Sequence, residues 1–117
     1  NAYLWKLIND LSLHVGQMTP TEIYREYIKD AGVFDIFVVK EEALPRFITA
    51  WEQNGIGWLA ISSKTGTNEV VCYYGTSVYN KEEFSRILQS VIDDCKAFGI
   101  PTKSDAEIQS IVEAYFE

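Results

Sequence analysis

The sequence contains few of the residues and motifs on which enzymes and metal sites depend. It has one histidine, His14, and two cysteines, Cys72 and Cys95, which show neither a CxxC motif nor the spacing of metal ligands. Neither GxxxxGK[ST] nor GxGxxG is present, so no known phosphate-binding loop is encoded. A lone histidine in a predicted helix, with no nucleophile nearby, does not indicate a catalytic triad. We therefore expect no cofactor and no enzymatic activity.

Long apolar runs and an excess of positive charge are missing as well. No apolar run reaches the roughly 18 residues that a membrane-spanning helix needs, and no signal peptide is visible. The chain carries 10 basic against 17 acidic residues, a net charge of −7, which argues against binding to nucleic acids or anionic membranes. Two reduced, buried cysteines fit a reducing compartment. Together these features predict a cytoplasmic protein that does not contact a membrane.

Acidic residues do occur in adjacent pairs, at 41/42, 82/83 and 93/94. All three pairs lie on predicted helices. Three of the four residues in the first two pairs fall in first helical turns, where carboxylates interact favourably with the helix dipole. This structural interpretation is favoured, and a metal-dependent nuclease is kept as the less favoured alternative.

The length of 117 residues and the hydrophobic content of 47% predict a single folded domain over residues 1–117. Apolar periodicity, caps and turn residues predict helices over 2–15, 18–32, 40–55, 80–99 and 104–117, and strands over 33–39, 58–63 and 69–74. The fold class is α+β, with a small antiparallel sheet, made of a β-hairpin plus one strand, packed with about five helices. Such a sheet is small for so much helix. We expect either further strands before residue 1 or another subunit that covers part of the sheet.

The beginning of the chain also leads us to expect further residues before residue 1. The first residue is Asn1 rather than methionine, and helical periodicity starts at once. The helix over 2–15 therefore appears in the sequence without a preceding cap. We expect an N-terminal segment of the full-length protein to lie upstream.

The stretch "CYYGTSVYNKEEF", residues 72–84, marks a corner between a strand and a helix. Gly75 accounts for the turn, and Asn80 with Glu83 accounts for the start of the helix. Thr76 and Ser77 precede the cap and are not explained by it. This hydroxyl pair is therefore a candidate binding feature.

Aromatic and basic residues near this corner would suit single-stranded nucleic acid. Tyr73 and Tyr74 must face opposite sides of the strand, and Lys64 lies at the tip of the hairpin. Aromatic rings could stack on bases while hydroxyls and a lysine contact the backbone. The alternative is that both tyrosines pack under helices.

The chain resembles the NinB/Orf family of phage recombination proteins and related proteins of phages and prophages of Gram-positive bacteria. The matching pieces are "NAYLWKLINDLS" at 1–12, "YGTSVYNKEEFSRILQSVIDDCKAFGI" at 74–100 and "SDAEI" at 104–108. The resemblance implies a non-enzymatic recombination mediator that binds single-stranded DNA, usually as a homodimer. It also implies contacts with single-strand-binding protein, because such proteins are thought to help load a recombinase onto strands that this protein coats.

Carried over by residue, Asn1 and Trp5 match the family's first helix, and Thr76 and Ser77 match its hydroxyl pair. The chain departs from the family at Val78, where the family's type member has an arginine. It departs again at residue 80, an asparagine in place of a second basic residue, although a lysine follows. The predicted DNA-binding residues are Trp5, Lys6, Lys64, Tyr74, Thr76, Ser77 and Lys81. The alternative is an acidic protein-interaction module that dimerises through apolar helix faces.

Overall fold

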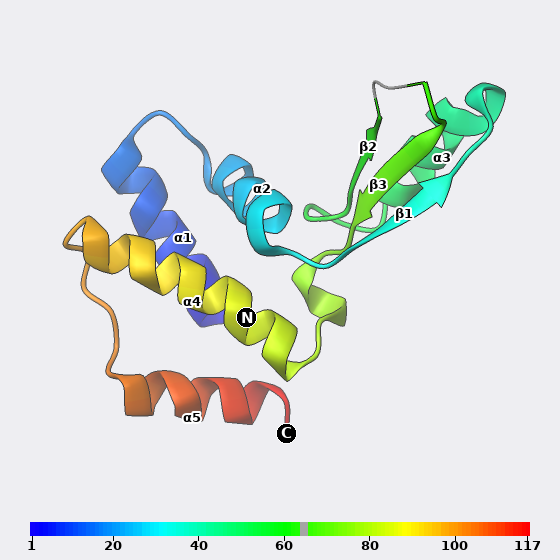
Figure 1. The fold of residues 1–117 in the computed structure, drawn as a ribbon. Helices are drawn as coiled ribbons and strands as arrows, with labels where there is room; N and C mark the ends of the chain where they lie inside the picture. Colours follow the sequence, from blue (N-terminus) through cyan, green and yellow to red (C-terminus); the bar gives the residue numbers. More distant parts are fainter. Residues whose placement is uncertain (64–65) are drawn as a thin grey trace.

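The chain folds into a helical lobe and a sheet lobe that are joined by a narrow neck (Figure 1). A computed structural model describes residues 1–63 and 66–117. The helical lobe contains α1 (Ala2–Val15), α2 (Pro20–Ala31), α4 (Lys81–Ala97) and α5 (Asp105–Tyr115). The sheet lobe contains β1 (Phe34–Val38), η1 (Glu41–Ala43), α3 (Leu44–Glu52), β2 (Leu59–Ser62) and β3 (Glu69–Tyr73), and η2 (Thr76–Val78) leads back to the helices. The predicted α+β fold, with a small antiparallel sheet and about five helices, is confirmed.

Side-chain caps set the start of four helices. The Asn1 side chain accepts hydrogen bonds from the N–H groups of Tyr3 and Leu4, at 2.9 and 3.2 Å, so the expectation that the first helix lacks a cap is wrong. Thr19 caps α2, whereas Asn80 and Ser104 each form a reciprocal capping box with the glutamate three residues later. Each such cap stabilises a protein by about 1 kcal/mol. Local sequence therefore determines where these helices begin.

The main hydrophobic core lies between α1, α2 and α4 (Figure 1). On α1, Leu4, Leu7, Ile8 and Leu11 are buried in this core, but Val15 is exposed. Val15 is the last residue of the helix, and the chain turns at the following residue, the left-handed Gly16. The central helix of this core is α4, whose apolar stripe is buried from Phe84 to Cys95.

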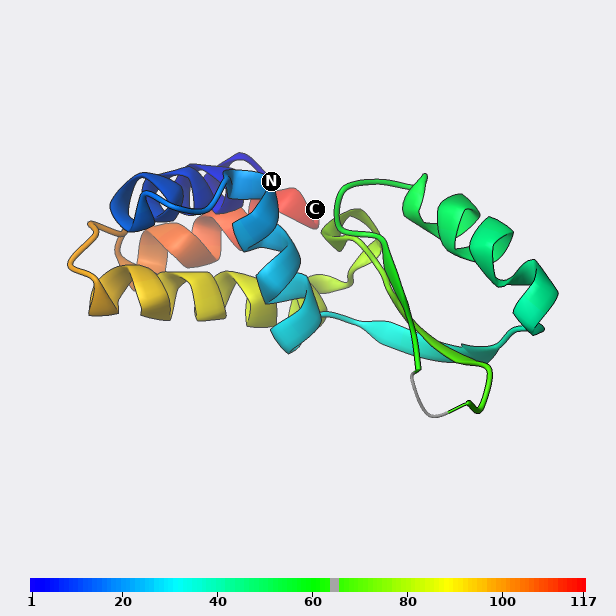
Figure 2. The same cartoon turned by 90° about the horizontal axis from the view of Figure 1, so that it is seen from above.

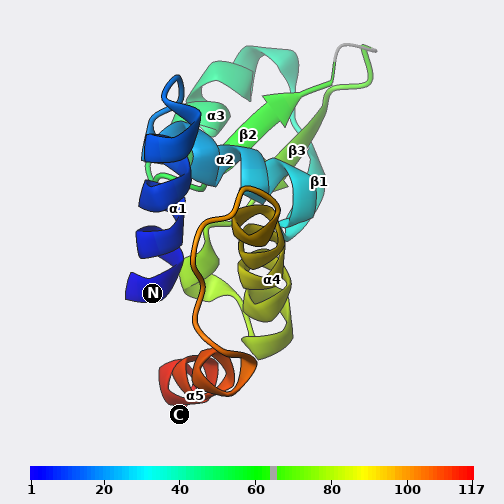
Figure 3. The same cartoon turned by 90° about the vertical axis from the view of Figure 1, so that its left-hand side faces the viewer.

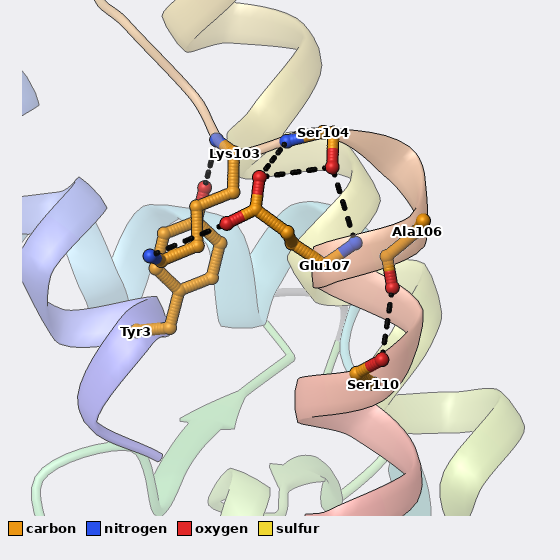
Figure 4. A network of polar contacts seen from close by, with 6 residues as sticks. All are labelled: Tyr3, Lys103, Ser104, Ala106, Glu107 and Ser110. Atoms are coloured by element: carbon orange, nitrogen blue, oxygen red, sulfur yellow. Dashed lines mark hydrogen bonds and ion pairs between the residues drawn. The ribbon is translucent and has the colours of Figure 1, made fainter.

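The last helix, α5, and helix α2 lie on opposite sides of α4 (Figure 1; Figure 3 gives the side view). The segment just before α5 is tied to α1, because the Tyr3 hydroxyl accepts a hydrogen bond of 2.9 Å from the Lys103 N–H (Figure 4). The Lys103 ammonium group lies 5.9 Å from the centre of the Tyr3 ring and 4.0 Å from the Glu107 carboxylate. Val112 is the one residue of α5 buried in the core. The end of the helix is held by the rings of Tyr115 and Phe116, whose centres lie 5.1 and 5.7 Å from that of Phe84.

The sheet has the strand order β1-β3-β2, and both pairs are antiparallel. Helix α3 covers one face, where Val70 and Cys72 pack against Phe47 and Trp51. The sequence predicts one helix over 40–55, but the structure has a 3-10 turn followed by a shorter α-helix. Pro45, at the beginning of α3, lacks an N–H and cannot continue a helical ladder from the preceding turn.

Two tyrosine hydroxyl groups hold together the two chain segments that form the neck. The Tyr79 hydroxyl accepts a hydrogen bond from the Val33 N–H (3.0 Å) and donates one to the Tyr74 carbonyl (2.9 Å). The Tyr24 hydroxyl accepts from the Thr76 N–H (3.1 Å) and lies 3.0 Å from the Thr76 hydroxyl. Tyr79 thus joins the segment that enters the sheet to the segment that leaves it, whereas Tyr24 joins the second segment to α2.

We predict that Tyr79→Phe destabilises the protein by about 1–3 kcal/mol, because it leaves the partly buried Val33 N–H and Tyr74 carbonyl without their partner. Burial raises the pKa of Tyr79 to about 12, above the usual value of 10.0. The folded state therefore favours the neutral hydroxyl. This contribution is fully present below pH 10 and is lost as the pH rises through about 12.

Urea unfolding between pH 8 and pH 12 checks both effects. The wild type should lose stability over the upper part of this range, and Tyr79→Phe should lose less. Tyr115→Phe, which alters an exposed tyrosine, is the matched control and should behave as the wild type. Equal pH profiles for wild type and Tyr79→Phe would contradict the assignment.

Candidate functional site

A cleft of about 390 Å³ lies beside the neck, between the two lobes. Figure 2 shows that the start of α1 and the end of α5 lie on the side of the helical lobe that faces the sheet lobe. Residues from both lobes and from the neck line the cleft: Asn1, Trp5, Tyr24, Asn54, Gly55, Ile56, Gly57, Trp58, Gly75, Thr76, Ser77 and Tyr115. The cleft therefore exists only because the neck fixes one lobe against the other.

Two tryptophans face the cleft from opposite lobes. Trp5, on α1, packs on Tyr24 with a ring-centre distance of 4.7 Å. Trp58, just before β2, packs edge-on against Trp51 (5.4 Å) and Tyr74 (5.3 Å). Both Trp5 and Trp58 are only half-buried, so part of each ring is accessible. Flat apolar surfaces of this kind can take up another flat ring by stacking.

Two glycines allow the aromatic rings to lie close to the backbone. A Cβ added at Gly75 would lie 2.7 Å from Nε1 of Trp58, and one added at Gly57 would lie 2.7 Å from the Tyr24 ring. Real Cβ atoms do not approach other heavy atoms this closely. The positions of Trp58 and Tyr24 therefore require glycine at both sites.

The polar groups of the cleft are neutral. Asn1, Asn54 and Ser77 supply amide and hydroxyl groups, and among the described residues that line the cleft none has an acidic or basic side chain. One cation lies at its edge, because Nε of Arg25 donates a 2.9 Å hydrogen bond to the carbonyl of Ile56. Such a surface suits a flat, polar, aromatic ligand better than a highly charged one.

The structure brings three of the predicted DNA-binding residues into this cleft. Trp5, Thr76 and Ser77 line it together with Asn1, so all four positions carried over from the resemblance are on one surface. Thr76 is buried, and its backbone and hydroxyl are bonded to Tyr24. Its role is thus to hold the neck, whereas Ser77 is exposed.

The other predicted residues lie elsewhere. The Tyr74 hydroxyl donates a 2.6 Å hydrogen bond to Asp35, which raises the pKa of Tyr74, and its ring packs on Trp51. Lys6 pairs with Asp10 at 2.7 Å, one turn further along α1. Lys81 pairs with Glu113 of α5, and Lys64 lies outside the described residues. Of the predicted residues, Trp5, Thr76 and Ser77 therefore share one surface, whereas Tyr74 and the described lysines lie apart from it.

Sequence reasoning missed four residues of this region: Tyr24, Arg25, Asn54 and Trp58. The stretch "NGIGW", residues 54–58, carried the only available signal. Two glycines next to a tryptophan indicate a tight backbone approach to an aromatic ring, but the pattern is also that of a simple turn. Tyr24 and Arg25 lie in a helix far away in sequence, and only the folded chain brings them here.

The acidic pairs and the cysteines form no second site in the part of the chain that the structure describes. There, no three His, Cys, Asp or Glu side chains come close enough to hold a metal ion. Asp94 accepts a 2.6 Å hydrogen bond from Tyr27, whose pKa is raised by burial and by this carboxylate. Cys72 and Cys95 are free thiols, and burial raises the pKa of each, which makes them less reactive.

Comparisons of the chain with protein-family models, curated proteins and solved structures found no match. Within the described residues, no helix is both long and apolar enough to cross a membrane.

We predict that Gly75→Ala displaces Trp58 and lowers the stability by about 1–3 kcal/mol, the usual effect of overpacking. The backbone at Gly75 (φ −73°, ψ 157°) suits any residue, so the effect is due to the added methyl group alone. Tryptophan fluorescence should shift to longer wavelength as Trp58 becomes more exposed. Ser77→Ala, two residues away on the exposed surface, is the control, and an unchanged Gly75→Ala spectrum would contradict the geometry.

Proposed function

We propose that the protein binds single-stranded DNA by stacking bases in the cleft beside the neck, and that it acts as a non-enzymatic accessory protein in DNA recombination. One observation carries this proposal: Asn1, Trp5, Thr76 and Ser77, which the resemblance selects from distant parts of the chain, all line one cleft. Trp58 faces the same space from the other lobe and adds a second aromatic surface.

The chemistry of the cleft supports bases rather than phosphates as the recognised groups. Trp5 and Trp58 can stack on unpaired bases, and stacking contributes about 1–3 kcal/mol per base. The amides of Asn1 and Asn54 and the hydroxyl of Ser77 can donate and accept hydrogen bonds at base edges. A volume of about 390 Å³ lies within the range of small-ligand sites.

The shortage of cations near the cleft has a measurable consequence. Each neutralised phosphate of a single strand contributes about 0.7 to the slope of log K against log salt concentration. Among the described residues that line the cleft or bond to its lining, Arg25 is the cation at the edge, so we expect a shallow slope of about −1. This distinguishes the protein from DNA-binding proteins that rely on basic surfaces.

The proposal is tested by titrating a fluorescent single-stranded oligonucleotide, with a duplex of the same sequence for comparison, at low and moderate salt. Trp5→Ala and Trp58→Ala should each weaken binding to the single strand by about tenfold or more, in line with the loss of one stacked base. Phe98→Ala is the matched control, since Phe98 is an exposed aromatic residue that lies against His14, away from the cleft. Circular dichroism verifies that each variant is folded.

The absence of binding at low salt would overturn the proposal, as would equal affinity for single strand and duplex. Lys6→Gln and Lys81→Gln test the two described lysines that were predicted to contact phosphates. Because both are in ion pairs outside the cleft, we expect less than about threefold change in affinity for either variant. Contacts with single-strand-binding protein and a recombinase belong to the same proposal and can be tested by adding each protein to the DNA complex.

A further inference from the structure

The outer edge of β1 is unprotected. On either side of this strand, the Val33 carbonyl accepts a hydrogen bond from the Tyr74 N–H and the Val39 N–H donates one to the Asn68 carbonyl, so in the alternating ladder residues 35 and 37 direct their backbone groups toward β3. The alternate residues Phe34, Ile36 and Val38 therefore direct their N–H and C=O groups outward. No partner for these groups is found among the described residues. The strand "FDIFV" also lacks the lysine, proline or bulge with which edge strands usually avoid pairing.

The opposite edge of the sheet is protected. There the Ala60 N–H, which points away from β3, donates a 3.2 Å hydrogen bond to the carboxylate of Glu52 on α3. A charged side chain placed along β2 in this way hinders the approach of another strand. The two edges therefore differ, and β1 is the edge that can accept a partner.

The same three residues of β1 belong to an uncovered apolar face. Helix α3 covers only the face that carries Val70 and Cys72. On the other face, Phe34, Ile36 and Val38 are 51%, 55% and 76% exposed. Exposed apolar groups gathered on one strand, next to open backbone groups, mark an association surface.

We propose that two copies of this chain pair edge to edge through antiparallel β1 strands, with a two-fold axis at Ile36, to form a continuous six-stranded sheet. The strand is self-complementary about this residue. Ile36 of one chain lies opposite Ile36 of the other, and Phe34 lies opposite Val38. Every outward N–H and C=O of these three residues therefore gains a hydrogen-bond partner. Asp35 comes opposite Phe37 rather than another carboxylate, so no like charges face each other. A two-fold axis also closes the assembly at two copies.

This arrangement makes a specific prediction for cysteine cross-linking. Hydrogen-bonded antiparallel partners lie about 5.5 Å apart at their Cα atoms, which is within the range for a disulfide. Ile36→Cys should therefore form a covalent dimer under mild oxidation. Val38→Cys should not form a covalent dimer, although position 38 is also accessible. The two cysteines at position 38 would lie four residues apart along the paired strands. Native Cys72 and Cys95 are buried and do not interfere.

A mixture of Phe34→Cys and Val38→Cys proteins supplies the positive control for the register, since these two positions face each other in the dimer. The mixture should give the cross-linked heterodimer, and neither protein alone should cross-link. Efficient cross-linking of Val38→Cys alone would overturn the proposed register. The experiment uses no DNA, so its outcome is independent of the function proposed above.

Light scattering across a wide range of concentrations tests the dimer without cross-linking. The wild type should be dimeric at high concentration, and Ile36→Asp should raise the dimer dissociation constant by about tenfold or more, because two carboxylates would meet at the axis. Val78→Asp, at an exposed apolar site outside the sheet, should leave the dimer unchanged. A wild type that stays monomeric up to millimolar concentration would overturn the proposal, as would equal weakening by both variants.

Discussion

The arrangement of the molecule depends on the hydroxyl group of Tyr79. This one oxygen bonds to the chain entering the sheet lobe at Val33 and to the chain leaving it at Tyr74. Nearby, a Cβ at Gly32 would lie 2.4 Å from a carbonyl oxygen and 2.6 Å from the Tyr79 hydroxyl, so the two segments are packed as closely as glycine allows. Since only these two segments connect the lobes, the bonds of Tyr79 and Tyr24 set the angle between them.

The neck determines the shape of the cleft. Thr76 is bonded to Tyr24, whose ring supports Trp5 of the helical lobe, and it follows Gly75, against which Trp58 of the sheet lobe is packed. A change at the neck therefore moves both tryptophans relative to each other. A binding surface split between two lobes needs such a rigid junction, because ligand groups must be met from both sides at a fixed separation.

The sequence predicted the local features and missed the long-range ones. Asn80 with Glu83, Ser104 with Glu107, and the alternating strands have short-range signatures, so the helices, the hairpin and the fold class could be read from them. The hydroxyl pair could be recognised as unusual, but its role could not be read, because the partner of Thr76 is Tyr24, more than fifty residues away. Trp58 was overlooked for the same reason: its neighbours are distant in sequence.

The acidic charge of −7 is compatible with a protein that selects unpaired bases. Four lysines are neutralised by nearby carboxylates, namely Lys6, Lys29, Lys81 and Lys103, so these side chains offer little attraction to phosphates. In the binding mode proposed above, a duplex would present mainly its charged backbone to such a surface and would be repelled, whereas a single strand would also offer its bases to Trp5 and Trp58. Weak phosphate binding would then be a source of selectivity, because stacking is the favourable contribution that only the single strand can supply.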